Sequence, residues 1–148
     1  MAFQFRMEKV LALKEREKDL SELLYSESIA QFETVARKLY ETLKKKEQYE
    51  QFCADKLSEG VHVGFLRQYQ NHIQTLNFLI LKQQSQMHQA KCQMEKHQKA
   101  AMEKSVEVKM YQTLKEKHFN DYKEKLKRAE LQQLDELSLR NLGERHGS

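Results

Sequence analysis

Histidine and cysteine are the residue types in this chain that could bind a metal ion, and three of them lie close together in the sequence. His88 and Cys92 are four residues apart, so a helix would place both on one face, and His97 follows about one turn later. A zinc site needs three or four converging ligands, and no fourth ligand is evident. We therefore interpret these residues as polar side chains of the surface and the packing seam, and we predict neither a metal nor any other cofactor.

The remaining chemistry-bearing residues do not form a recognisable catalytic set. The sequence shows no Gly-rich phosphate loop, no Ser-His-Asp set and no paired carboxylates in a pocket, so we predict that the protein is not an enzyme. The hairpin predicted below places Cys53 and Cys92 about 30 Å apart, which excludes an internal disulfide and fits a reducing compartment. No apolar run approaches the ~18 residues of a membrane span, and no signal-peptide core is present. We expect a cytoplasmic protein without a transmembrane segment.

Composition indicates two long helices. The chain of 148 residues has no Pro and only four Gly, two in mid-chain (Gly60 and Gly64) and two near the C-terminus, and Gly and Pro are what usually interrupts regular structure. Both uninterrupted stretches are rich in Glu, Lys, Gln, Leu and Ala, which favour helix. The 26 basic and 22 acidic residues are interspersed, as on the solvated face of a coiled coil, and predict no nucleic-acid partner.

Apolar spacing predicts a heptad seam in each stretch. In the first stretch the apolar residues follow two registers that disagree near Leu24–Ile29, and we expect a change of supercoil there. The first register comprises Phe3, Val10, Leu13, Leu20 and Leu24. The second comprises Tyr25, Ile29, Phe32, Ala36, Leu39, Leu43, Lys46, Glu50, Cys53 and Leu57. The second stretch keeps one register, which comprises Leu66, Tyr69, Ile73, Leu76, Ile80, Gln83, Met87, Ala90, Met94, His97, Ala101, Lys104, Val108, Tyr111, Lys115, His118 and Tyr122. Its polar members lie mainly in the distal half, so packing should loosen away from the turn.

The predicted fold is all-α: an antiparallel coiled-coil hairpin forming a single domain, residues 1–148. Helix one should span about 3–58, the turn 59–65 and helix two 66–140, with a flexible tail at 141–148. Both mid-chain glycines should supply the positive φ that ends helices. Residue i should then lie opposite a residue near 122 − i, although two registers one heptad apart remain open. Helix two is longer and should overhang, which leaves two ends for two partners.

Apolar residues outside the seam predict two docking surfaces. The first lies near the turn, because an apolar patch on a soluble protein usually marks a contact site; the alternatives are self-association or a thicker seam. Its residues are Tyr49, Phe52, Tyr69, His72, Leu76, Phe78, Leu79 and Leu81. The second lies at the terminal end, where apolar and basic residues mix; the alternative is an ordinary solvated coiled-coil end. Its residues are Phe3, Phe5, Arg6, Lys9, Val10, Leu11, Leu13, Tyr122, Lys123 and Lys125.

Two segments carry a family resemblance over nearly the whole length. The opening segment at residues 3–16 reads FQFRMEKVLALKER, and the segment after the turn at 66–76 reads LRQYQNHIQTL. With these segments at this separation, the chain resembles the FliJ family of flagellar export proteins, from a Gram-positive bacterium. The resemblance implies a stalk-like coiled coil whose terminal end enters the hexameric ring of the export ATPase. It also implies that the turn-proximal part contacts the cytoplasmic domain of the export gate, at Lys38, Thr42, Lys45, Tyr49, His72, Leu76, Leu79 and Gln83.

The implied function is to help couple the ATPase to protein export during flagellum biogenesis, and so to serve motility and chemotaxis. The protein would be peripheral at the cytoplasmic side of the membrane, at the flagellar base. One alternative is a general escort for export substrates and their chaperones, with no role in the ring. Another is a structural spacer that assembles through its own seam.

Overall fold

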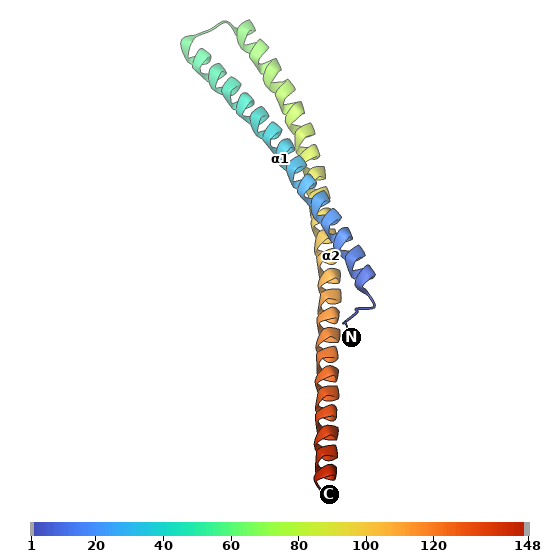
Figure 1. Ribbon diagram of the computed structural model, residues 1–148. Coiled ribbons are helices and arrows are strands. Elements are labelled where there is room, and N and C mark those ends of the chain that lie inside the picture. The colour runs from blue at the N-terminus through green and yellow to red at the C-terminus, as the bar shows by residue number, and fades with distance from the viewer. Residues whose placement is uncertain (1, 147–148) are drawn as a thin grey trace. The chain divides into compact units, whose positions relative to one another are not determined.

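The computed structural model describes residues 2–146, with the side chains of 145 and 146 left undescribed, and contains two helices. Helix α1 spans Glu8–Glu59 and helix α2 spans Val63–His146 (Figure 1). They have 52 and 84 residues and pack against each other as a hairpin, so the all-α fold with a longer second helix is confirmed. Backbone packing divides the chain into two units. Unit 1 combines Met1–Lys18 with Glu103–Ser148, and unit 2 is Asp19–Met102.

Three helix ends differ from the sequence-based expectation: the start of α1, and the start and the end of α2. Helix α1 begins at Glu8 rather than near residue 3. The segment before Glu8 is not helical, and this allows both Phe3 and Phe5 to turn toward α2. In a helix these two side chains would point about 200° apart. Helix α2 begins at Val63 rather than near residue 66, and it continues through Gly143 to His146, where a flexible tail was expected from residue 141; residues 147 and 148 of that tail lie outside the described part of the chain.

The turn between the helices depends on one glycine. Gly60 has φ 76°, the left-handed conformation that ends α1. Its N–H donates to the carbonyl of Leu57 at 3.2 Å, and the N–H of Val61 donates to the carbonyl of Lys56 at 3.3 Å, which is the Schellman pattern. The expectation that Gly64 also supplies a positive φ is wrong, because Gly64 lies inside the first turn of α2.

Helix α2 begins with a side-chain cap from His62. The ring Nδ1 of His62 accepts a hydrogen bond from the N–H of Gly64 at 3.1 Å. The carbonyl of His62 accepts one from the N–H of Phe65 at 3.1 Å. These bonds satisfy donors that every helix N-terminus leaves free, and they fix the start of α2 at Val63.

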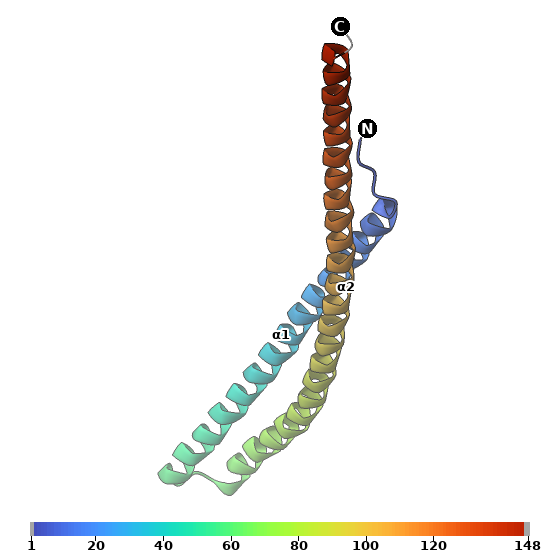
Figure 2. The same ribbon diagram turned by 90° about the horizontal axis from the view of Figure 1, so that it is seen from below.

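In unit 2 the two helices run antiparallel on either side of the turn, as both views show (Figures 1 and 2). The ring centroids of Tyr49 and His72 are 5.9 Å apart, and those of Phe52 and Tyr69 are 4.7 Å apart. In unit 1, Glu8 pairs with Lys115 at 2.9 Å. These pairs agree with residue i lying opposite a residue near 122 − i.

In α1 the predicted first register is wrong, whereas the second register is confirmed at Tyr25, Phe32, Leu39, Lys46 and Cys53. The inward positions advance without a break in steps of three and four, and they are buried or half-buried; they comprise Leu11, Lys14, Lys18, Ser21, Tyr25, Ser28, Phe32, Val35, Leu39, Thr42, Lys46, Tyr49, Cys53 and Lys56. Many of these inward positions are polar. The heptad prediction relied on apolar residues, several of which lie beside the inward positions. Leu13 and Leu20, which were assigned to the first register, are 53% and 58% exposed.

Polar residues in this seam satisfy their own hydrogen bonds. Ser28 and Thr42 are 6% and 7% exposed, and their hydroxyls donate to the carbonyls of Tyr25 and Lys38 at 2.6 and 2.9 Å. A buried hydroxyl bonded to its own helix loses little on leaving water. The face of α1 toward α2 can therefore be polar and still pack.

The predicted seam of α2 is buried or half-buried at every position except His118, which is exposed. Packing does not loosen away from the turn, contrary to expectation. Val108 and Leu11, 2% and 4% exposed, lie in unit 1 and form a core cluster with Phe5. The non-helical start of the chain adds Phe3 and Phe5 to this cluster, and of these two the heptad pattern had included only Phe3.

Candidate docking surfaces

A cluster of aromatic rings covers the turn-proximal end of unit 2. The ring of Tyr69 lies 4.7 Å from that of Phe52, 5.1 Å from that of Phe65 and 5.8 Å from that of Tyr49, centroid to centroid. His72 stacks on Tyr49 with an interplanar angle of 20°. Such contacts add to apolar burial, so this cluster fixes the two helices next to the turn.

The predicted turn-proximal residues differ in burial: Leu76 is buried, Tyr49, Phe52 and Tyr69 are half-buried, and His72, Phe78, Leu79 and Leu81 are exposed. Leu76 is 9% exposed and belongs to the core, so in the free chain it is not part of the accessible surface. Phe78 and Leu81 are 66% and 64% exposed, while Leu79 is 40% exposed. Their exposure does not fit a thicker seam, and it leaves a patch of large apolar side chains open to solvent.

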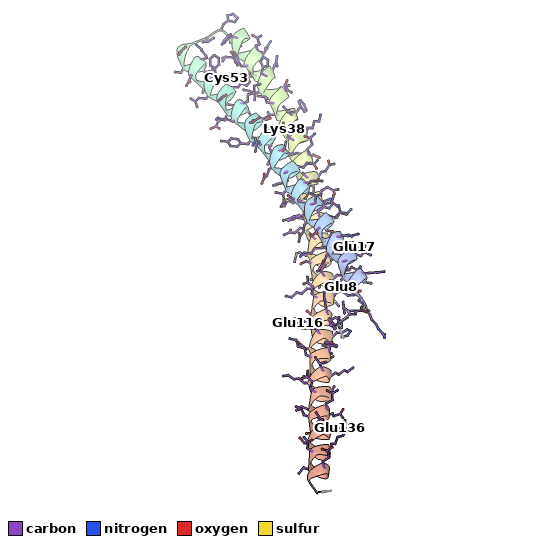
Figure 3. All side chains as sticks on the ribbon, in the orientation of Figure 1. Glu8, Glu17, Lys38, Cys53, Glu116 and Glu136 are labelled. Carbon is purple, nitrogen blue, oxygen red and sulfur yellow. The ribbon has the colours of Figure 1, made fainter. Side chains whose placement is uncertain are left out.

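The positions that the family resemblance implies for the gate contact include both surface and seam residues. Lys38 and Lys45 are exposed on α1, whereas Thr42 is buried between them (Figure 3 labels Lys38). On α2, Gln83 is half-buried, and its side-chain oxygen Oε1 is buried with no hydrogen-bond partner. The positions implied for the gate contact therefore include side chains that the free chain exposes and others that its seam partly or fully buries.

The terminal end in unit 1 is built on the non-helical start of the chain. The ring of Phe3 lies 5.2 Å from Phe119 and 5.6 Å from Tyr122, and the ring of Phe5 lies 5.6 Å from His118. Phe5 is 7% exposed. Of the predicted terminal residues, Phe5 and Leu11 are therefore core residues in the free chain, and Phe3 and Tyr122 are half-buried.

The other predicted terminal residues are accessible. Arg6, Lys9 and Lys125 are exposed, and so is Lys123, whose ammonium lies 4.6 Å from the ring centroid of Phe119. Val10, at 38% exposed, and Leu13, at 53%, add apolar surface next to these charges. This end therefore presents a basic and apolar surface that could contact an acidic partner.

Ion pairs connect α1 and α2 within unit 1. Lys14 lies 3.3 Å from Glu107, and Lys104 lies 3.1 Å from Glu17. The hydrogen bond from Lys104 lowers the pKa of the Glu17 carboxyl, and the hydrogen bond to Glu107 raises the pKa of the Lys14 ammonium. Lys14, Glu17 and Glu107 were not predicted to lie at the helix interface, because the spacing of apolar residues cannot reveal positions that are held by ion pairs.

Beyond Tyr122, every residue of α2 with a described side chain is exposed, and no other helix lies beside this segment (Figures 1 and 2). It carries six leucines that are 47% to 70% exposed: Leu126, Leu131, Leu134, Leu137, Leu139 and Leu142. The heptad register predicted from the sequence ends at Tyr122, before all six of them. Their number on a helix without a partner makes this overhang a third candidate surface.

Cys53 and Cys92 are free thiols, the first half-buried near the turn and the second exposed. The Sγ of Cys92 lies 3.7 Å from Nε2 of His88, and no group of three potential metal ligands is found within the described part of the chain. Neither helix, over the residues described, has a segment long and apolar enough to cross a membrane.

Comparison with known proteins decides the family. The family model described as "Flagellar FliJ protein" matches residues 3–147. The chain belongs to the FliJ family. A curated relative, the flagellar FliJ protein of Bacillus subtilis, is 39% identical over 140 residues, which cover 95% of each chain. This relative is consistent with the expected Gram-positive origin of the FliJ-family chain. None of the solved structures gives a significant match.

Proposed function

We propose that this FliJ-family chain is a stalk-like component of the flagellar protein export apparatus. Its terminal end binds the ring of the export ATPase, its turn-proximal part binds the cytoplasmic domain of the export gate, and the chain itself hydrolyses nothing. Membership of a flagellar family supports the setting. The two partners come from the resemblance stated above.

The observation that carries the proposal is the different chemistry of the two surfaces. The terminal end combines Arg6, Lys9 and Lys125, all exposed, with the half-exposed Val10 and Leu13. The turn-proximal patch of Phe78, Leu79 and Leu81 is apolar. Surfaces of such different character select different partners, as a coupling protein requires.

Unequal contact with ring subunits explains how such a stalk would act. A single two-helix end is asymmetric, so identical subunits arranged around it cannot all make the same contacts. Subunits that bind it more tightly in one nucleotide state are shifted toward that state. The protein would in this way favour ring assembly and influence ATP turnover, and it would act at the flagellar base on the cytoplasmic side of the membrane.

The direct test adds the purified chain to purified export ATPase and measures hexamer formation and ATP turnover. Both should rise. A double variant, Lys9→Glu with Leu13→Asp, should lose most of the effect while retaining helicity, because both side chains are exposed. Unchanged assembly and turnover with the wild-type chain would contradict the proposal.

A second candidate function is an escort for export substrates and their chaperones, and the six exposed leucines of the overhang favour it. Pull-downs separate the two functions. Capture of chaperones but never of the ATPase would support the escort, and loss of capture on truncation after Tyr122 would place the binding on the overhang.

A further inference from the structure

Helix α2 carries a second heptad stripe within unit 2, outside the seam. Its members follow one another in alternating steps of three and four, and every one of them is exposed: Phe78, Leu81, Ser85, His88, Cys92, Glu95, Lys99 and Met102. Counted from the seam residues, they fall on the two heptad positions that lie farthest from the seam. Phe78, Leu81 and Met102 are 66%, 64% and 63% exposed. Heptad spacing is what packs one helix against another, so this face suits a second helix.

The middle of this stripe holds two side chains that bind metal ions. The Sγ of Cys92 lies 3.7 Å from Nε2 of His88, and both residues are exposed. In a tetrahedral zinc site, bonds of about 2.3 Å to sulfur and about 2.0–2.1 Å to nitrogen hold two such ligand atoms about 3.5–3.6 Å apart. The helix therefore already holds this pair at the separation of two zinc ligands.

One chain cannot complete the site. No group of three potential metal ligands is found among the residues that the structure describes, and His97 is half-buried in the seam. A closed zinc site needs four ligands, and a second copy supplies another His88 and another Cys92, which makes a Cys₂His₂ set. We propose that one Zn²⁺ joins two copies of the chain through His88 and Cys92 of each, with the ion on the twofold axis of the dimer.

Charge decides the direction of the second helix. If the two α2 helices run antiparallel about the ion, His88 and Cys92 exchange places, so residue i lies opposite residue 180 − i of the other copy. Phe78 then lies opposite Met102, and Glu95 lies opposite Ser85. A parallel pair would instead bring Glu95 against Glu95 and Lys99 against Lys99, and like charges that face each other are unfavourable. The stripe therefore favours the antiparallel pair.

A twofold axis through the ion arranges the four ligand atoms as zinc requires. Along one α2 helix, the side chains of His88 and Cys92 start about one turn apart in height and about 40° apart around the helix. On the facing antiparallel helix, the axis exchanges the two heights and keeps the two sides. The four ligand atoms then lie at alternate corners of a box, which is a tetrahedral arrangement. Each Cys92 binds as its thiolate and releases its proton to solvent.

This dimer goes beyond the proposed function and does not rest on it. It would cover Phe78 and Leu81, so a chain in the zinc-linked dimer could not use this patch to bind the export gate. The experiments below contain neither the gate nor the ATPase, so their failure would leave both proposed contacts untouched.

Metal titration of the reduced full chain tests the site. Co²⁺ serves as the probe, because tetrahedral Co²⁺ bound to thiolate absorbs strongly in the visible range, and Zn²⁺ should displace it. One ion should bind per two chains. His88→Ala and Cys92→Ser should each weaken binding at least tenfold at unchanged helicity, since both side chains are exposed. Cys53→Ser is the matched control and should bind as the wild-type chain does. One ion per chain, or binding that survives Cys92→Ser, would overturn the proposal.

Sedimentation equilibrium tests the assembly. With one Zn²⁺ added per two chains the wild-type chain should be a dimer, and the chelator EDTA should return it to a monomer. Cys92→Ser should stay monomeric at the same zinc concentration, and Cys53→Ser should dimerise. A monomer in the presence of zinc, or a dimer that EDTA leaves intact, would refute this zinc-linked dimer.

A photo-cross-linker tests the direction of the helices. Replacing the exposed Phe78 by p-benzoylphenylalanine introduces a group that reacts with nearby C–H bonds, and methionine is a favoured target. In the zinc-loaded dimer this group should link to the peptide of the second copy that contains Met102, and EDTA should remove the product. A product that links the two copies at residue 78 of each would show a parallel pair and overturn the antiparallel arrangement.

Discussion

The Nζ atom of Lys104 on α2 lies 3.1 Å from Oε2 of Glu17 on α1, at the seam of unit 1. Glu17 also lies 3.5 Å from Lys14, which in turn lies 3.3 Å from Glu107. These pairs select between the two helix registers that the heptad pattern left open. A shift of seven residues would move Lys104 opposite Val10 or Leu24, and the ion pairs would be lost.

This ion-pair network makes the stability of the fold depend on pH in the acidic range. The pKa of Glu17 is lowered in the folded chain, chiefly by its hydrogen bond from Lys104. Its contribution is therefore complete above the unfolded pKa of about 4.3 and is lost as pH falls through the lower, folded value. Thermal melts should show a midpoint that falls below about pH 4.3 less steeply in Glu17→Gln than in the wild-type chain. Parallel pH profiles would contradict the assignment.

Lys14, a basic partner in the same network, makes stability depend on pH in the opposite direction. The pKa of Lys14 is raised, first by its hydrogen bond to Glu107. Its contribution is complete below the unfolded pKa of about 10.4 and is lost as pH rises through the higher, folded value. Lys14→Met should remove this alkaline loss from the melting midpoint, and an unchanged alkaline slope would show that the pair is not formed in solution.

Two leucines two residues apart should differ sharply in their contribution to stability. Leu11 is 4% exposed in the core of unit 1, and Leu13 is 53% exposed. Leu11→Ala should lower the free energy of unfolding by about 2–4 kcal/mol, from lost burial and the cavity left behind. Leu13→Ala should change it by less than about 0.5 kcal/mol, as is usual at the surface. Urea unfolding measures both, and equal effects would mean that the inward face of α1 is assigned wrongly.

The contrast between the two helices shows what the sequence could predict. In α2 the seam residues are mostly apolar, so their spacing identified the buried face at every position except His118. In α1 the same spacing is occupied by Lys14, Ser28 and Thr42, which pack through ion pairs and hydrogen bonds to their own helix. Apolar periodicity cannot reveal a seam of that kind, because the stabilising partner lies on the other helix or on the backbone.

The docking surfaces were predictable only in part. The patch at Phe78 and Leu81 could be found because both residues leave the seam register. An open groove in unit 1, lined in part by Met7 and Met110, could not be found, since Met7 belongs to the non-helical segment before Glu8. The only signal was the spacing of Phe3 and Phe5, two residues apart, which would place them on different faces of a helix.

The two mid-chain glycines should respond differently to alanine. Gly60 has φ 76°, so Gly60→Ala forces a side chain into the left-handed region at a cost of about 1–2 kcal/mol. At Gly64 a Cβ would lie 3.2 Å from the Nδ1 of His62 and would disturb the cap of α2. That cost, about 0.5–2 kcal/mol, is partly offset because alanine favours helix over glycine by about 0.5–1 kcal/mol. Urea unfolding should therefore show the larger loss for Gly60→Ala, and the reverse order would contradict this description of the turn.

The exposed patch of unit 2 should affect binding without affecting the fold. Phe78 and Leu81 are 66% and 64% exposed, so replacing both by Ser should change the free energy of unfolding by less than about 1 kcal/mol and leave helicity intact. Binding to the isolated cytoplasmic domain of the export gate should weaken at least tenfold, since large apolar anchors dominate such contacts. Leu57→Ser is a matched control, because Leu57 is 65% exposed in the same unit but lies on α1. Calorimetry that finds equal affinity for the double variant and the wild-type chain, at equal helicity, would exclude this patch from the gate contact.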